Sequence, residues 1–283
     1  MEVEGCGINQ EGYMGHRSTP LGWAASNGHE EVVEMLLGRG DLDPNKPNRY
    51  RQTPLSEAAW DGHEEVVRML LGRDDVNPNQ PSFGGRTPLS YAALNGHEGV
   101  VKILLGRGDV NPNEPDTHGQ TPLYYAVQNG HEGVVKILLR QGNITPDIPD
   151  IFGQTPLFCA VWNGHEGAVK ILLGRGDVNP DKPDNNGLTP LCLAARCGHE
   201  GVVKILLERD GVNPDKPDNQ GQTPLQCAAQ NGHEGVVKIL LGPGNVNPNG
   251  QNKRGRWALC CATKRVLVRA IARLQPPEST TPT

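Results

Sequence analysis

Histidine is the residue type whose spacing in this sequence most invites a chemical role. Seven of the nine histidines recur at intervals of 34 residues, and each stands between a glycine and a glutamate. A neutral imidazole can ligate zinc, and a positioned imidazole can act as a general base. Either chemistry depends on how the 34-residue period folds, because several side chains would have to converge. The seven are His29, His63, His97, His131, His165, His199 and His233.

A Thr-Pro-Leu triplet begins ten residues before every one of these histidines, and residues 82–115 illustrate the period. Thr87 is a good N-cap, and Pro88 suits the first position of a helix, where its missing N–H would be unbonded anyway. Leu89 and the alanines at 92–93 give this helix one narrow apolar face. Gly96 can adopt the left-handed conformation that ends a helix. The pattern predicts a short first helix in each repeat.

The second half of the repeat predicts a second short helix that begins at His97-Glu98. Residues 100, 101, 104 and 105 are valine or leucine and fall on one side, while Glu98 and Lys102 form a favourable pair four residues apart. Gly106 and Gly108 are expected to stop this helix. The proline-rich and asparagine-rich residues 109–115 predict an extended excursion into the next repeat.

Helices of two or three turns do not persist alone in water, so each pair must stack on its neighbours. Stacking joins the apolar faces into one continuous core, and the alanine pairs allow the first helices to approach closely. The scarcity of aromatic residues, 4 % of the chain, fits such a locally packed body. We therefore expect an elongated array of repeats.

The stacked arrangement weighs against the chemistry that single motifs suggest. Histidines one layer apart would be separated by roughly 10 Å, too far to share one zinc ion, so we interpret them as residues that fix the turn between two helices. Cys159 and Cys227 belong to the interior column of the first helices and are not expected to act as nucleophiles. The seven cysteines have no Cys-x-x-Cys spacing, which argues against a zinc set or a disulfide framework.

Two further motifs have structural interpretations. The Arg-Gly-Asp triplets that begin at residues 39, 107 and 175 mark the end of second helices, so we do not interpret them as adhesion signals. The Asp-Asn-Asn-Gly sequence at 184–187 lacks the first oxygen ligand and the terminal glutamate of a calcium loop. No phosphate-binding glycine loop occurs. The sequence predicts no enzyme activity, no cofactor and no metal site.

The repeated residues closely resemble the ankyrin repeat. The string Gly-Gln-Thr-Pro-Leu at 119–123, Asn-Gly-His-Glu at 129–132 and the Asp-x-x-Gly at 116–119 carry this resemblance, which covers about residues 14–251. It implies an all-α solenoid of helix-turn-helix units joined by hairpin-like loops, similar to ankyrin arrays of fungal signalling proteins. The family's histidine after Thr-Pro-Leu is replaced here by Gly22, Ser56, Ser90, Tyr124, Phe158, Cys192 and Gln226.

The period sets the expected domain organisation. We expect an N-terminal lead-in at 1–13, a degenerate capping repeat at 252–275, in phase with the others, and a disordered tail at 276–283. Between them lie seven repeats, at 14–47, 48–81, 82–115, 116–149, 150–183, 184–217 and 218–251.

Charge and hydropathy exclude several classes of partner. The net charge is −5, while residues 250–283 carry +6, so the array itself is at −11 and would repel nucleic acid. The basic C-terminal segment is interpreted as the charged face of a cap, and a basic binding tail is the alternative. No apolar run is long enough to span a bilayer, and no signal peptide is evident. We expect a monomeric cytoplasmic protein, with a nuclear location left open.

Side chains that vary between repeats predict a protein-binding surface. They gather at the loop tips and at the position after the alanine pair, where aromatic and arginine residues are typical of interfaces. Tyr91, Tyr124, Tyr125 and Phe158 are instead expected to pack inside, whereas Leu188 belongs to the tip set. The predicted protein-binding residues are Tyr50, Trp60, Phe83, Arg86, Leu94, His118, Gln120, Phe152, Trp162 and Arg196.

These observations predict a non-enzymatic interaction module or scaffold that binds another intracellular protein through the concave face of the array. The alternative is a structural spacer, or a fragment of a larger signalling protein, with no partner of its own, because near-identical repeats also suggest recent duplication. The identity of a partner is beyond the sequence.

Overall fold

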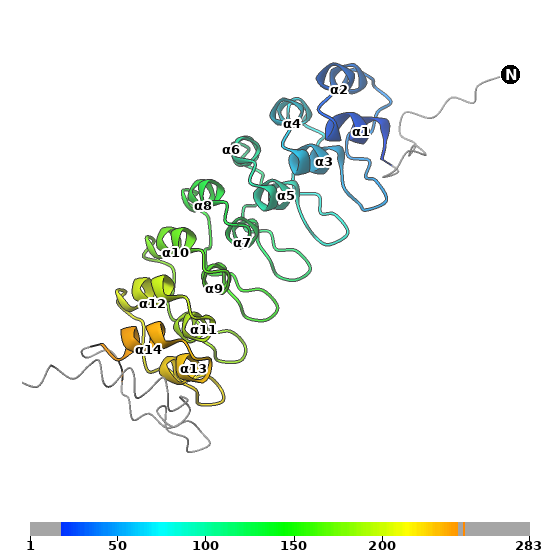
Figure 1. The fold of residues 1–283 in the computed structure, drawn as a ribbon. Coiled ribbons are helices and arrows are strands. Elements are labelled where there is room, and N and C mark those ends of the chain that lie inside the picture. The colour runs from blue at the N-terminus through cyan, green and yellow to red at the C-terminus, as the bar shows by residue number, and fades with distance from the viewer. Residues whose placement is uncertain (1–17, 243–245, 247–283) are drawn as a thin grey trace, which may run out of the picture. The chain divides into compact units, whose positions relative to one another are not determined.

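A computed structural model of the chain describes residues 18–242 and residue 246. Within these residues the chain forms fourteen α-helices and no strand, and the helices come in pairs (Figure 1). The all-α, helix-turn-helix prediction is therefore confirmed. The first helices of the pairs are α1 (Pro20–Ser26), α3 (Pro54–Asp61), α5 (Pro88–Asn95), α7 (Pro122–Gln128), α9 (Pro156–Trp162), α11 (Pro190–Cys197) and α13 (Pro224–Gln230). The second helices are α2 (Glu30–Leu37), α4 (Glu64–Leu71), α6 (Glu98–Leu105), α8 (Glu132–Leu139), α10 (Glu166–Leu173), α12 (Glu200–Leu207) and α14 (Glu234–Leu240).

The chain divides into two compact bodies, residues 1–151 and residues 152–283, called here the N-terminal and C-terminal bodies. In the N-terminal body, α1, α3, α5 and α7 pack side by side, and α2, α4, α6 and α8 form a second row. In the C-terminal body, α9, α11 and α13 form one row and α10, α12 and α14 the other. The predicted lead-in, capping repeat and tail lie outside the described residues.

The first helices begin and end as the sequence predicts. In each, the threonine side chain accepts a hydrogen bond from the backbone N–H three residues on, as Thr87 does from Ser90 at 3.3 Å, and proline follows the cap. Gly96 closes α5 in the left-handed conformation, with φ of 78°. The residues that replace the family's histidine stay beside this cap. Gln226, for example, accepts the N–H of Thr223 and completes a capping box.

The second helices bury one side only. In α6, Val100, Val101 and Leu104 are fully buried, whereas Leu105 is only half-buried. Lys102 Nζ lies 3.7 Å from a carboxylate oxygen of Glu98 on the exposed side. Six of the seven second helices end where the glycine was expected to stop them, and α14 ends one residue earlier. Gly106 is right-handed, however, and Arg140 and Glu208 occupy the same position in other repeats. The helix end therefore does not require glycine there.

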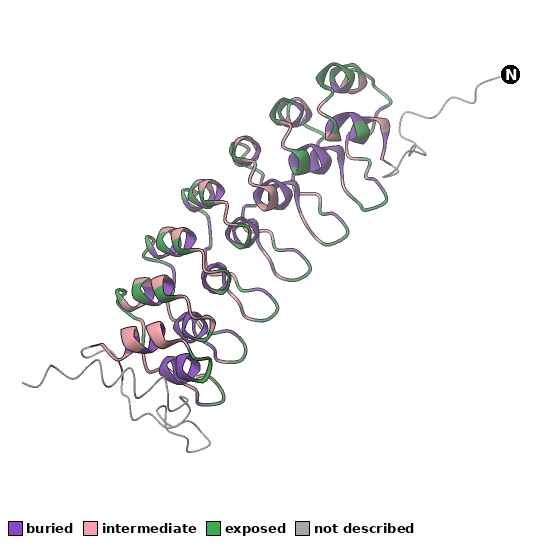
Figure 2. Cartoon of the chain, viewed as in Figure 1, coloured by how far each residue is buried: buried purple, intermediate pink, exposed green. Residues whose placement is uncertain are grey.

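The core lies between the helix layers of each body. The leucine of Thr-Pro-Leu and the alanine pair, which is Ala-Val in the fourth and fifth repeats, are at most 4 % exposed. Figure 2 shows the first helices as the most buried elements. Close packing of these small residues removes apolar surface that an isolated pair would leave in water. The predicted interior positions of Tyr91, Tyr124, Tyr125 and Phe158 are confirmed.

The loop tips are tied to one another through their backbones. In the N-terminal body, the N–H of Phe83 donates to Tyr50 O at 2.9 Å, and the N–H of Thr117 donates to Gly84 O at 3.0 Å. Asp116 Oδ1 accepts the N–H groups of His118 and Gln120, both at 2.8 Å, and so closes its own tip. Asn185 donates to Phe152 O in the same way in the C-terminal body. The tips therefore form an ordered backbone row in each body.

Polar side chains also link neighbouring repeats in the segments that lead from the second helices to the tips. Asn45 Nδ2 donates to Asp75 O at 2.6 Å, and its Oδ1 accepts the N–H of Asn77 at 2.8 Å. Asn79 and Asn113 repeat this pattern with the following repeats. Such bonds fix the spacing and register of adjacent layers.

The Arg-Gly-Asp triplets take part in the same linkage. Arg107 forms a bidentate pair with Asp109 and donates from Nη1 to Leu71 O, in the preceding repeat, at 2.9 Å. Arg73 makes the equivalent contacts with Asp75 and Leu37 O, although an aspartate replaces the glycine of its triplet. The arginine and the aspartate therefore join repeats.

Arg51 gives a direct test of the tip conformation. It has φ of 60°, whereas the equivalent residues of later repeats are left-handed glycines such as Gly85. A residue with a Cβ atom raises the free energy of the folded state by about 1–2 kcal/mol in this left-handed region. Glycine avoids that cost, but part of the gain is lost because glycine gives up more conformational entropy on folding. We expect Arg51→Gly to raise the free energy of unfolding by about 0.5–1 kcal/mol in denaturant titration.

The matched variant is Gly85→Ala, for which we expect the opposite sign. An added Cβ at Gly85 would meet the backbone N of Thr117 at 2.8 Å. If both variants shift stability in the same direction, the conformation assigned to the tips is wrong.

Candidate functional site

The regularly spaced histidines join repeats. His63 Nε2 lies 2.9 Å from Ser26 O, and His97 Nε2 lies 2.9 Å from Trp60 O, each in the preceding repeat. His131 contacts Leu94 O in the same way at 3.0 Å. In the tautomer with the proton on Nε2, each ring donates to the end of a neighbouring first helix. The prediction that these histidines fix the turn between two helices is thus made specific: they make no side-chain cap bond at their own second helix, and the turn that they contact belongs to the preceding repeat.

The other candidate chemical groups are engaged or buried. Cys159 and Cys227 lie in the interior, as predicted, and so does Cys192. The hydrogen bond with Cys227, together with burial, raises the pKa of the Cys192 thiol. Among the described residues, no group of three or more histidine, cysteine, aspartate or glutamate side chains could hold a metal ion.

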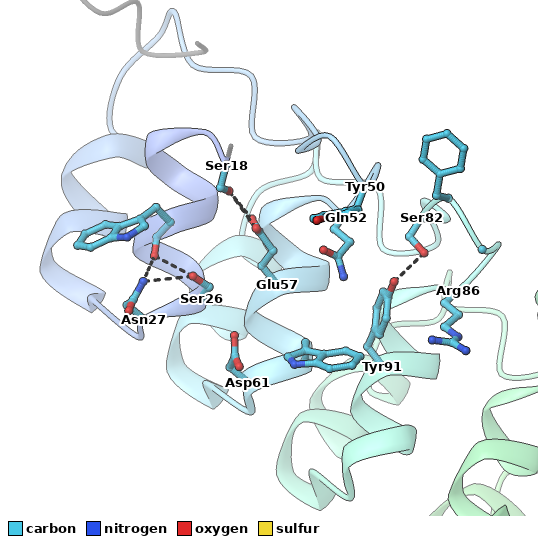
Figure 3. A pocket seen from close by; sticks show the side chains of 14 residues that line it. Ser18, Ser26, Asn27, Tyr50, Gln52, Glu57, Asp61, Ser82, Arg86 and Tyr91 are labelled. Carbon is cyan, nitrogen blue, oxygen red and sulfur yellow. Dashed lines mark hydrogen bonds between the residues drawn. The ribbon is translucent and has the colours of Figure 1, made fainter. Parts of the chain in front are cut away.

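The N-terminal body contains a concave groove on its first helices. It has a volume of about 880 Å³ and is lined by the first helices α1, α3 and α5 and by the loops that lead into them (Figure 3). Most of its lining is aromatic or polar. The lining residues are Ser18, Trp23, Ser26, Asn27, Tyr50, Gln52, Glu57, Trp60, Asp61, Ser82, Phe83, Gly84, Arg86 and Tyr91.

The rings of the groove are held in place by their neighbours. Trp60 packs edge-on against Tyr91, with ring centroids 5.2 Å apart, and Tyr91 Oη donates to Ser82 Oγ at 2.7 Å. Even so, 39 % of Trp60 is exposed, so one side of the indole faces solvent. Figure 3 shows the Tyr91 hydroxyl directed at Ser82. A fixed, partly exposed ring is ready for contact with a ligand.

Two more exposed rings stand on the tips above the groove. Phe83 is 71 % exposed, and Tyr50, whose carbonyl accepts the Phe83 N–H, is 42 % exposed. The guanidinium of Arg49 lies 4.5 Å from the centroid of the Tyr50 ring and donates to its hydroxyl. These rings are therefore carried on a hydrogen-bonded backbone.

The wall of the groove contains a buried carboxyl group. Glu57 is only 7 % exposed, and it accepts hydrogen bonds from Ser18 Oγ at 2.8 and 2.9 Å and from Asn48 Nδ2 at 2.9 Å. Burial raises the pKa of Glu57 to about 7, an effect that these hydrogen bonds oppose and the nearby Asp61 reinforces. Among the described residues, no lysine, arginine or histidine forms an ion pair with it.

Arg86 is a basic residue in the lining, and its side chain contacts the next repeat. Its Nε donates to Tyr125 Oη at 2.7 Å, and its guanidinium lies 4.8 Å from the centre of that ring. Tyr125 Oη in turn donates to the buried Asp116 at 2.5 Å. Burial and the bond to Asp116 raise the pKa of Tyr125 to about 12. Arg86 therefore braces two repeats at one end of the groove.

Comparison with known proteins agrees with this architecture. A family model described as ankyrin repeats in three copies matches residues 3–82, 73–150, 110–184 and 144–218, and a second model, described as ankyrin repeats in many copies, matches 198–241. The chain belongs to the ankyrin repeat family. No curated protein matches it. Ankyrin repeats are generally modules for protein–protein interaction and typically have no enzyme activity. No helix in the described part of this ankyrin chain has the length and apolar character needed to cross a bilayer.

The ankyrin array distributes the predicted binding residues over both bodies. Tyr50, Trp60, Phe83 and Arg86 line the groove of the N-terminal body. Three others lie outside that lining in the same body: Leu94, His118 and Gln120. Three belong to the C-terminal body: Phe152, Trp162 and Arg196, all exposed. Leu188 is 4 % exposed, so its assignment to the exposed tip set was wrong: at a position that is mostly glutamine, this apolar side chain packs inward.

Sequence reasoning missed Trp23 and Glu57. Trp23 is 51 % exposed, at the position where Tyr91 and Tyr125 are buried. Glu57 occupies the same position of its own repeat. The other repeats carry an apolar or aromatic residue at this position, so the glutamate could have been recognised from the sequence as unusual. A carboxylate is rarely buried without a function or a partner.

The raised pKa of Glu57 predicts a pH-dependent stability. The pKa of Glu57 is raised from 4.5 to about 7 in the folded state, so the folded protein holds this proton more tightly than the unfolded chain does. The resulting stabilisation is complete below the unfolded-state pKa and is lost as the pH rises through the folded-state pKa. The loss amounts to at most about 3 kcal/mol. We therefore expect Glu57→Gln to raise the free energy of unfolding relative to the unmodified protein more at pH 8 than at pH 5.

Denaturant titration of both proteins at the two pH values measures this difference. Glu98→Gln, at an exposed position of α6, is the control and should show little change with pH. A stability difference for Glu57→Gln that is the same at pH 5 and pH 8 would show that Glu57 ionises normally.

Proposed function

We propose that this protein is a non-enzymatic interaction module whose N-terminal body binds a segment of another intracellular protein in the groove between α1, α3 and α5. The observation that carries the proposal is the set of fixed, exposed rings at this groove, namely Tyr50, Trp60 and Phe83. Such side chains are the usual anchors of protein interfaces.

The construction of the groove supports this proposal energetically. A ligand gains affinity when the receptor side chains do not have to be ordered on binding. Trp60 is braced by Tyr91, and Phe83 is joined through its backbone to Tyr50. Tyr50, Trp60 and Phe83 each still have at least 39 % of their surface exposed, and that surface is available to a partner.

The C-terminal body has its own exposed residues of the same kind. Phe152 and Trp162 are 58 % and 54 % exposed, and Arg196 is exposed as well. We propose that they contribute a second contact surface. We further propose that the protein acts as a monomer in the cytoplasm or the nucleus.

Capture from cell lysate, with the bound proteins identified, tests the proposal. We expect the combined change of Tyr50, Trp60 and Phe83 to alanine to abolish capture of at least one protein. The change of Phe152 and Trp162 to alanine should reduce capture through the C-terminal body. The unfolding midpoints should stay within a few degrees of the original, because each of these residues is at least 39 % exposed.

Val32 and Met35 on α2 provide the matched control, since both are exposed apolar residues outside the groove. Their replacement by alanine should leave capture unchanged. Capture and stability lost together would mean that the groove rings serve packing. An unmodified chain that retains no protein specifically would favour a structural spacer.

A further inference from the structure

The groove combines aromatic walls with two acidic groups. Glu57 and Asp61 both lie on α3, one turn apart (Figure 3), and Trp60 of the same helix also lines the groove. Among the described residues of the lining, the one basic side chain is Arg86, which is engaged with Tyr125 and Asp116. Arg49, outside the lining, is stacked on Tyr50. The end of the groove near α1 and α3 is therefore acidic.

Glu57 determines what can cover this end of the groove. Its carboxyl group is already largely removed from water and has no cationic partner among the described residues. A segment that covers the groove removes the remaining solvent. A carboxylate sealed without a counter-charge is strongly unfavourable, so a neutral or acidic segment would force Glu57 to take up a proton or would be repelled. A basic side chain would instead compensate the charge.

The aromatic walls fit the same ligand. A lysine or arginine side chain has an apolar stem that packs along a ring and a cationic head that is attracted to the ring face and to carboxylates. Trp60 is exposed beside Asp61, and Trp23 lines the α1 side. The two oxygens of Glu57 accept hydrogen bonds from Ser18 and Asn48, which holds the carboxyl group in position at the wall.

We propose that the N-terminal groove selects an extended protein segment carrying an exposed lysine or arginine, whose stem lies along Trp60 and whose cationic head contacts Glu57 and Asp61. This inference rests on the proposed function of the groove and specifies the chemistry of the partner. Charge complementarity favours a basic segment over an apolar or an acidic one.

Binding of matched synthetic peptides to the full-length protein tests this inference. The probe is acetyl-Gly-Ser-Leu-Lys-Leu-Ser-Gly-amide, and the comparison peptides carry norleucine or glutamate in place of lysine. At pH 8 we expect the lysine peptide to bind about tenfold more tightly than the norleucine peptide, which corresponds to about 1.4 kcal/mol. The glutamate peptide should bind most weakly. The preference for lysine should shrink at pH 6, because protonated Glu57 no longer attracts the cation.

Two variants isolate the role of the carboxyl group. Glu57→Gln should remove the preference for lysine and its dependence on pH, whereas Glu98→Gln should retain both. Other titratable groups stay in place in both variants. Among the described residues they are Asp61, Arg86, Tyr50 and Tyr91 in the lining, and His29, His63 and His97 at the N-caps of α2, α4 and α6. Carbon-13 NMR of the Glu57 carboxyl in the unmodified protein gives a second readout, since the lysine peptide should lower its pKa.

Several results would overturn the inference. One is equal binding of the lysine and norleucine peptides at pH 8, and another is a preference for lysine that survives Glu57→Gln. A third is binding of all three peptides with equal strength that is lost in the Trp60→Ala variant. That result would show that the groove binds peptides but has no site for a cationic side chain. Absence of binding by every peptide would also reject the inference, while the capture experiment would still decide the proposed function on its own.

Discussion

The contact between successive helix pairs is the interaction on which the rest of the structure depends. No helix in the described chain exceeds eight residues, and helices of that length are unstable alone in water. Their apolar faces are covered by the neighbouring pair, through alanines and leucines that are almost fully buried. Asparagine side chains, the Arg-Asp pairs and the repeat histidines then fix the distance between layers by hydrogen bonds to backbone groups one repeat away.

The same contacts also hold the surface that we propose to bind protein. His97 holds the carbonyl of Trp60 from the following repeat, and Tyr91, also from that repeat, supports its ring. The tip that carries Phe83 is bonded to the tip that carries Tyr50. Tyr50, Trp60 and Phe83 are thus each joined to a residue of a neighbouring repeat. Stacking therefore provides both stability and a preorganised site, which reduces the entropy that a partner loses on binding.

The 34-residue period allowed much of this arrangement to be predicted. Local rules of capping and periodicity predict that the first helices start at threonine and proline and end at Gly96 and its equivalents. The same rules predict the exposure of Trp60 and Phe83. The properties of the groove do not follow from these rules. They depend on contacts between residues at least nine positions apart, and most of these contacts cross between repeats. The contacts are those of Glu57 with Asn48, Arg86 with Tyr125, and His97 with Trp60. They depend on the register between layers, which a sequence of near-identical repeats leaves open. Leu188 shows the same limit, because a tip position can face inward when its side chain is apolar.

Amide hydrogen exchange of the tip residues tests most directly whether stacking orders this surface. The N–H groups of Phe83 and Thr117 donate to carbonyls of the preceding tip, and that of Val101 donates within α6. If stacking fixes the tips, the Phe83 and Thr117 amides should be protected nearly as well as Val101, because they open only when neighbouring repeats separate. Exchange of both tip amides within about tenfold of the unfolded rate, with Val101 still protected, would show that the tips move independently of the stack.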